Sequence, residues 1–266
     1  MRQRFFNTAS ALAAAAVFSL ALNAQSLAPL NEEGVAVGAL APEAIADAPK
    51  PPWDITGTWL HGGGPNNPWQ FSPPEGFKLT PEAQVFWDGT QAAAAKGKVY
   101  QDDIGQCWPA GLPIIMTRVW PIAMIQKPTV TFMISGFMNE IRIIYTDGRE
   151  HTDPDIVIPS FSGESIGHWE DDTLVVDTTG FVNDHHWIDR GVKASDALHI
   201  VERMRLINDG KTLEIAYMAE DPKMWEGQWH WTKRWRRVDD QEITEAHCLP
   251  DLNEHMPSIR TVLEDQ

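Results

Sequence analysis

The segment GESIGHWEDDTLVVDTTGF, residues 163–181, decides the fold class. Apolar and polar residues alternate on both sides of Asp171-Asp172, which is the pattern of two half-buried strands, 165–170 and 173–179, joined by a tight turn. Polar side chains also interrupt the apolar faces of both expected strands. The segment therefore predicts a β-hairpin that carries a candidate site.

The same two-residue period recurs along the second half of the chain. Further strands are expected over 129–135, 140–146, 199–207, 212–220, 228–238 and 242–248. Turn residues such as Asn208-Asp209-Gly210-Lys211 separate neighbouring strands. This pattern predicts an all-β antiparallel meander that closes into a barrel, with a two-sheet β-sandwich as the alternative. One short helix is expected over 80–96, where Thr80 can cap the first turn.

The N-terminal region is typical of an exported protein. Two arginines precede an apolar run over residues 9–22, which predicts a signal peptide over 1–24 with cleavage near Ala24. Residues 25–52 are rich in Ala and Pro and are expected to form a flexible leader. A single β-barrel domain is then expected over 53–266, in a protein that is periplasmic or secreted.

The charge balance bears on the class of partner. The chain has 21 Lys and Arg against 37 Asp and Glu, a formal net charge of −16. Such an acidic chain repels phosphate backbones and anionic lipids, so we expect no nucleic-acid partner and no membrane insertion. A small molecule is the expected substrate or ligand, and the sequence indicates no oligomeric state.

The chain has two cysteines, Cys107 and Cys248. Export places thiols in an oxidising compartment, so we predict a disulfide between them. A pair of buried free thiols is the alternative.

Glu202 is the first candidate catalytic residue. The strand expected over 199–207 places it on the apolar face, between Ile200 and Met204. A buried carboxylate must be paired or lose its charge, so Glu202 could serve as a general acid or base. The alternative is a structural ion pair with Arg142 or Arg203.

Four other residues complete the predicted catalytic set. His168 could act as a base if Asp177 on the paired strand orients its ring, although a lone strand histidine is more often structural. Tyr145 shares a face with two isoleucines, so its hydroxyl would need a polar partner in a pocket. Arg149 could stabilise developing negative charge, with a solvated loop charge as the alternative.

Candidate substrate-binding residues lie in a loop and on two strands. The loop over 180–191 concentrates His, Asp and an aromatic residue, and loops on a rigid barrel commonly carry function. The indoles on the strand over 228–238 could stack on a flat ligand or could fill the core. The predicted set is His186, Trp187, Asp189, His199, Trp229 and Trp231.

We expect no cofactor. Neither a phosphate-binding loop nor a dinucleotide fingerprint occurs, and there is no HExxH pair. A metal held by one loop histidine together with His168 or Asp177 is the alternative.

Two resemblances to known families follow from short motifs. Gly57-x-Trp59 resembles the first strand of lipocalin-like barrels, which implies that an arginine of the last strand, Arg234, Arg236 or Arg237, packs over the tryptophan. Residues 143–151, 163–181 and 198–203 resemble a group of secreted bacterial proteins that share YTDGR, SIGxWEGDTLVVDTxGF and LHxxER segments. Asp171 stands where that group has glycine. The second resemblance implies a family but no particular chemistry.

These features lead to two hypotheses of function. The first is a secreted, cofactor-free enzyme that performs lyase, isomerase or dehydratase chemistry on a small, largely apolar or aromatic molecule in the barrel mouth, with Glu202 or His168 as the base. The alternative is a non-catalytic, lipocalin-like protein that binds or carries a small molecule.

Overall fold

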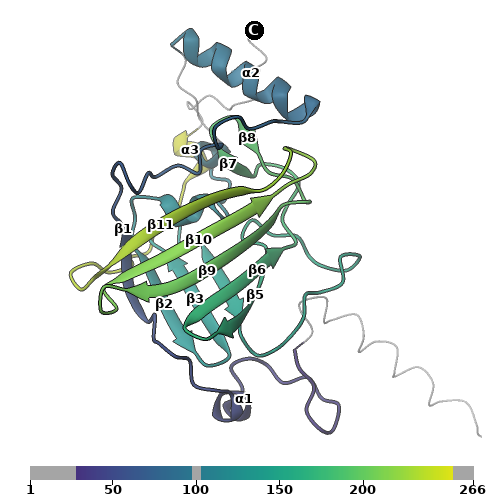
Figure 1. The fold of residues 1–266 in the computed structure, drawn as a ribbon, viewed down its shortest axis with the longest axis vertical. Helices are drawn as coiled ribbons and strands as arrows, with labels where there is room; N and C mark the ends of the chain where they lie inside the picture. Colours follow the sequence, from purple (N-terminus) through teal and green to yellow (C-terminus); the bar gives the residue numbers. More distant parts are fainter. Residues whose placement is uncertain (1–27, 98–102, 254–266) are drawn as a thin grey trace, which may run out of the picture.

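The computed structural model describes residues 28–97 and 103–253. The expected signal peptide lies outside these residues. A closed barrel of nine strands dominates the described part, with α2 at one end and α1 at the other (Figure 1). The barrel strands are β1 (Gly57–His61), β2 (Ile122–Lys127), β3 (Val130–Ser135), β4 (Ile141–Tyr145), β5 (Glu164–Glu170), β6 (Thr173–Thr179), β9 (His199–Ile207), β10 (Thr212–Glu220) and β11 (Trp229–Val238).

The remaining elements are short and lie outside the barrel wall. They are the two-stranded sheet of β7 (Trp187–Asp189) and β8 (Val192–Lys193), the helices α1 (Pro42–Asp47), α2 (Pro81–Ala95) and α3 (Pro250–Asn253), and the 3-10 turns η1 (Asp103–Gln106) and η2 (Ile114–Thr117). Among the described residues, no helix is long and apolar enough to cross a membrane.

The predicted meander is confirmed except at one seam. Barrel neighbours follow the order of the chain and pair antiparallel, but β4 and β5 run parallel and pair only through Ile144 with Ser165 and Tyr145 with Ile166. A parallel pair cannot be joined by a tight turn. Residues 146–163 therefore form a crossover. It leaves the end of β4 and brings the chain back, so that the start of β5 lies beside the end of β4.

The strands that close the barrel differ from those that the sequence predicts. The predicted strand over 242–248 is absent, because β1 pairs with β11 on one side and with β2 on the other. These pairings leave no free edge beside β11 for a further strand. Closure also excludes the sandwich alternative.

Two predictions outside the barrel can be compared with the structure. The helix expected over 80–96 is confirmed as α2, and the Thr80 side chain accepts a hydrogen bond from the Ala83 amide. The predicted leader contains α1, and within it Ala39 is buried and its carbonyl accepts a hydrogen bond from Thr129 Oγ1.

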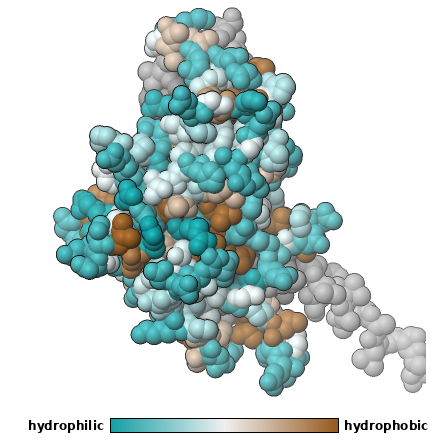
Figure 2. All heavy atoms as spheres, in the orientation of Figure 1, coloured by the Kyte–Doolittle hydropathy of each residue, from teal (hydrophilic) through white to brown (hydrophobic). Residues whose placement is uncertain are grey.

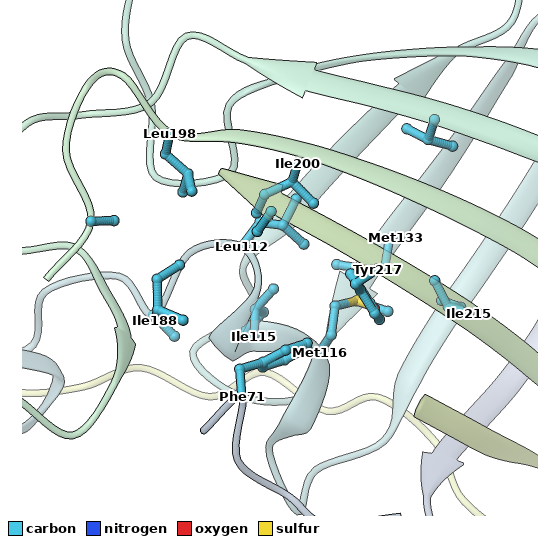
Figure 3. Close-up of a cluster of buried hydrophobic side chains, with 14 of the residues drawn as sticks. Phe71, Leu112, Ile115, Met116, Met133, Ile188, Leu198, Ile200, Ile215 and Tyr217 are labelled. Atoms are coloured by element: carbon cyan, nitrogen blue, oxygen red, sulfur yellow. The ribbon is translucent and has the colours of Figure 1, made fainter. Parts of the chain in front are cut away.

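Side chains fill the inside of the barrel. Phe71, Met133, Ile200 and Tyr217 pack together in a cluster that joins β3, β9 and β10 to the loops at one barrel end (Figure 3). Packed side chains therefore fill the interior at this end of the barrel.

Trp59 is fully buried, and the Arg237 guanidinium lies 4.3 Å from its ring centroid. Arg237 Nη1 also donates a hydrogen bond to the Thr56 carbonyl. The arginine that packs over the first-strand tryptophan is thus Arg237.

The predicted disulfide is confirmed. Cys107 and Cys248 are bonded across a sequence separation of 141 residues, which excludes the free-thiol alternative. The bridge ties the segment that follows β11 to the region of η1. The molecular face in Figure 2 is largely hydrophilic, with separate hydrophobic patches, as the acidic composition suggests.

Candidate functional site

Glu202 points into the barrel, as predicted, and is fully buried. Arg142 of β4 lies opposite and forms two hydrogen bonds with it, one from Nη1 to Oε1 at 3.1 Å and a second from Nη2 to Oε2. The same guanidinium donates to Ser165 Oγ at 3.0 Å and to Thr178 Oγ1 at 3.1 Å. The geometry is that of a buried, well-satisfied ion pair with Arg142.

Tyr217 of β10 completes this interior cluster. Burial raises the pKa of the Tyr217 hydroxyl well above its ordinary value, and the nearby charge of Glu202 acts in the same direction. The phenol is therefore neutral at any physiological pH. Both oxygens of the Glu202 carboxylate are engaged by Arg142.

His168 lies on the opposite face of the barrel wall from Glu202. Its side chain is 63% exposed, and Nε2 lies 3.3 Å from Glu170 Oε1 on the same strand. Residues alternate between the two faces of a strand, so His168 faces solvent while Gly167 faces the interior. The structure thus separates the two residues that the sequence proposes as alternative bases of one inward-facing site.

A second cluster lies on the outer face of the wall, where Asp177 of β6 contacts two imidazoles. His151 Nε2 lies 2.9 Å from Asp177 Oδ1, and His199 Nε2 lies 2.8 Å from Asp177 Oδ2. His151 belongs to the crossover and His199 begins β9. One carboxylate therefore links three segments that are distant in sequence.

Each imidazole also has a carboxylate at its other nitrogen. His151 Nδ1 lies 3.1 Å from Glu164 Oε2, and His199 Nδ1 lies 3.3 Å from Glu220 Oε1. We call the five residues Glu164, His151, Asp177, His199 and Glu220 the imidazole array. Its members come from the crossover and from β5, β6, β9 and β10.

The array shifts the pKa values of its members. The hydrogen bond to Asp177 raises the pKa of His151 and likewise that of His199, against the opposing effect of partial burial. Burial alone would raise the pKa of Asp177, but the hydrogen bonds from the two histidines outweigh it and hold that pKa well below its usual range. The arrangement favours two imidazolium rings around an ionised carboxylate.

A pocket of about 280 Å³ lies beside the array, at the junction of β4 and β5; we call it the seam pocket. The two strands share only two residue pairs, so the first residues of β4 have no partner in β5 and leave a wedge. The residues that line it include Ile141, Ile143 and Tyr145 of β4, Val157 and Ile158 of the crossover, and Glu164 of β5. Glu164 therefore belongs both to the pocket and to the array.

Tyr145 and Arg149 occupy the outer face near this pocket. The sequence groups Tyr145 correctly with Ile141 and Ile143, but that face points outward, because Arg142 and Ile144 are the buried residues of β4. Arg149 stacks on the Tyr145 ring at 3.7 Å and pairs with Asp147 at 2.6 Å. Its charge is thus neutralised locally.

The histidine and tryptophan of the 180–191 loop that the sequence proposes as binding residues are buried. His186 is fully buried and its Nε2 donates to the Leu112 carbonyl at 2.7 Å, while burial lowers its pKa to about 4. Trp187 is also buried and donates to Asp103 Oδ2. Both side chains hold the loop on the 103–112 segment.

Asp189 lies at the barrel mouth, where it helps to line a smaller pocket of about 120 Å³. Burial raises its pKa. Nearby, Lys233 donates to the Pro68 and Gln70 carbonyls, and burial lowers its pKa to about 8. These carbonyl contacts give Lys233 a structural role in holding the 68–70 segment.

The two tryptophans of β11 pack in the protein. Trp229 is buried and stacks on Trp225 with ring centroids 4.3 Å apart. Trp231 donates a hydrogen bond to the Ser72 carbonyl. Their observed contacts are those of the core-filling alternative.

Of the predicted residues, the structure brings Asp177 and His199 into the array and places Tyr145 in the adjoining pocket. Sequence reasoning missed Glu164 as a site residue and gave His151 no role. Glu164 is the first residue of β5, and its alternation with Ile166 and His168 on one strand face was the available signal.

Within residues 28–97 and 103–253, no group of three or more His, Cys, Asp or Glu side chains is arranged to hold a metal ion. Comparison of the sequence with protein-family models and with curated proteins found no match.

Proposed function

We propose that this protein is a cofactor-free enzyme that performs acid–base chemistry, of the lyase or isomerase type, on a small, largely apolar molecule bound in the seam pocket. The observation that carries the proposal is the Asp177 carboxylate shared by two imidazoles, one of which contacts the pocket residue Glu164. The site lies on the outer wall rather than in the barrel mouth. Perturbed titratable groups beside a pocket are a common mark of an active site.

In this proposal each group has a role. Glu164 meets the substrate and exchanges a proton with it, because it lines the pocket. In its neutral form, with its one proton on Nε2 toward Asp177, His151 can take that proton at Nδ1, 3.1 Å from Glu164, and Asp177 then stabilises the resulting imidazolium. Tyr145, in the same pocket, is placed to donate a hydrogen bond to a substrate oxygen.

Deuterium exchange tests the proposal across a range of candidate substrates. An enzyme that removes a proton from carbon incorporates solvent deuterium, so a panel of small ketones, hydroxy acids, aromatic aldehydes and primary amines can be screened in D₂O by NMR. For a compound that exchanges, Asp177→Asn should lower the rate at least about 100-fold, since it removes the partner of both imidazoles. His168→Gln is the matched control and should retain the rate.

A full rate in Asp177→Asn, or loss of the rate in His168→Gln alone, would refute the outer-wall assignment.

A non-catalytic binding protein is the second candidate. The Trp59–Arg237 contact favours a binding protein, because it resembles the contact between the first-strand tryptophan and a last-strand arginine in lipocalin-like barrels. A ligand that binds with no deuterium uptake, and equally well to Asp177→Asn, would support this function over catalysis.

We further propose that the protein is exported and belongs to the group of secreted bacterial proteins that its motifs resemble. The signal-like N-terminus and the Cys107–Cys248 disulfide support export. The segments that carry the resemblance supply Asp177 and His199, which meet in the array, so they include residues of the proposed site.

A further inference from the structure

We infer that the seam pocket takes a small amine, with an apolar body against the isoleucines of β4 and a positively charged ammonium group at Glu164. This inference rests on the proposed function for the choice of site and adds the class of substrate. It follows from three features: the apolar wall of the pocket, the local neutralisation of its positive groups, and the charge of the array.

The apolar wall is unusually open to solvent. Ile141 is 58% exposed and Ile158 is 60% exposed, and both line the same hollow, one from β4 and one from the crossover. Exposed aliphatic side chains that converge on a cavity mark a ligand site. A volume of about 280 Å³ lies just below the usual range for ligand pockets, which suits a small molecule.

The positive charges near the pocket are already compensated. Arg142 lies at the floor, but its guanidinium points into the barrel and is paired with Glu202. Arg149, on the adjoining turn, is paired with Asp147. A carboxylate or phosphate ligand would therefore find no available guanidinium among these residues.

The array carries a net negative charge whatever the state of its histidines. It contains the three carboxylates of Glu164, Asp177 and Glu220 against two imidazoles, so full protonation of both rings still leaves −1. Each neutral imidazole makes the array more negative by one. The sign of the local field thus favours a cation, as does the net charge of −16 of the whole chain.

Glu164 is the member of the array that can meet this cation. Oε1 accepts a hydrogen bond from Thr152 Oγ1, and Oε2 accepts from the Thr152 amide and contacts His151. Two carboxylate oxygens offer about four acceptor positions, so one remains for the ligand. A charged donor at that position gains more than a neutral one, because charge-assisted hydrogen bonds are the stronger class.

A matched ligand series tests the inference in the intact protein. Benzylamine, benzyl alcohol and benzoate share one apolar ring and differ in the charge of the head group. Dissociation constants from NMR titration at pH 7 should place benzylamine about tenfold tighter than benzyl alcohol, with benzoate the weakest. The titration measures binding alone, so it stands whether or not any compound is turned over.

Two variants locate the effect. Glu164→Gln should remove the preference for benzylamine over benzyl alcohol, while Glu170→Gln, which removes the same charge from an exposed site on the same strand, should keep it. Ile143→Trp should weaken all three ligands, because the indole fills the apolar wall.

The inference is overturned if benzoate binds as tightly as benzylamine to the wild-type protein, or if none of the three ligands binds. It is also overturned if Ile143→Trp leaves all three affinities unchanged. If Glu164→Gln fails to fold, the affinities of the three ligands for the wild-type protein and for Ile143→Trp still test the inference. Absence of turnover in every deuterium assay, together with tight benzylamine binding, would reject the proposed catalysis and leave the amine site standing.

Discussion

At Glu202, a charged side chain lies in the barrel interior and is held by one guanidinium. Taking two ions out of water is costly, and their mutual attraction offsets that cost only when the geometry satisfies both. Arg142 achieves this with further hydrogen bonds to Ser165 and Thr178. The pair therefore fixes the relative positions of β4, β5, β6 and β9 more than it adds net stability.

The first prediction concerns this pair. Glu202→Gln leaves the Arg142 charge buried without its counter-ion, so we expect a loss of about 3–5 kcal/mol in the free energy of unfolding. Urea denaturation followed by tryptophan fluorescence measures it. Replacing both residues with methionine should recover most of the loss, and Glu170→Gln is the surface control. A change under about 0.5 kcal/mol in Glu202→Gln would contradict the view of a buried ion pair.

Residue-level reasoning from the sequence reaches Glu202 because the period of its strand is unambiguous. Ile200, Met204 and Leu206 mark the inner face, and the structure places Glu202 on it. The same reasoning misplaces the face of Tyr145, because β4 has apolar residues on both sides. The crossover lies across the pocket from the outer side of that strand, and this is a tertiary arrangement that a local pattern does not show.

Among the elements, the crossover over 146–163 has the most direct bearing on the site. It is fastened at one end by His151 and Thr152 to Glu164. At the other end the Ser160 amide donates to the Gly180 carbonyl, and the Ser160 carbonyl accepts from the Val182 amide. Val157 and Ile158 lie between these anchors and form one wall of the seam pocket. The protonation state of His151 in the first anchor therefore governs how firmly that wall of the pocket is held.

The second prediction is that this anchor weakens as pH rises. The folded pKa of His151 is raised above the ordinary value of about 6.5, so its stabilising contribution is complete below that pH and is lost as pH rises through the folded pKa. The pKa of Asp177 is lowered, so its contribution is lost only in strong acid. The anchor should be firmest between about pH 4 and 6.5.

Amide hydrogen exchange at Thr152, corrected for the intrinsic dependence on pH, measures this effect. Protection should fall between pH 6 and pH 9 in the wild-type protein and in His168→Gln. In His151→Gln it should be low at pH 6 and nearly constant above. Constant protection in the wild-type protein across this range would show that the imidazole does not hold the crossover.

For the whole molecule, the closed barrel and the disulfide were predictable from strand period and cysteine count, while the parallel seam was not. The sequence between residues 146 and 163 has no repeating pattern, so it gives no sign that β5 starts beside the end of β4 and runs parallel to it instead of forming a hairpin with it. The seam pocket exists because of that parallel pairing. Because the alternation of strand faces does not reveal the seam, the sequence alone predicts a site in the barrel mouth.

The disulfide yields the last prediction, at the scale of the entire fold. Cys107 and Cys248 close a loop of 141 residues that includes ten of the eleven strands the structure describes, β1 alone lying before it. In the chain-entropy model a closure of this length restricts the unfolded chain by about 5 kcal/mol. Replacing both cysteines with alanine should therefore lower the free energy of unfolding by up to about that amount. Urea denaturation of the double variant beside the wild-type protein measures this loss.

Benzylamine affinity should be unchanged, because neither cysteine lines the seam pocket or belongs to the array. If the double variant kept wild-type stability, the bridge would be a local tie rather than a constraint on the whole chain. If it lost benzylamine binding while remaining folded, the site would depend on the region of η1, which the barrel geometry does not predict.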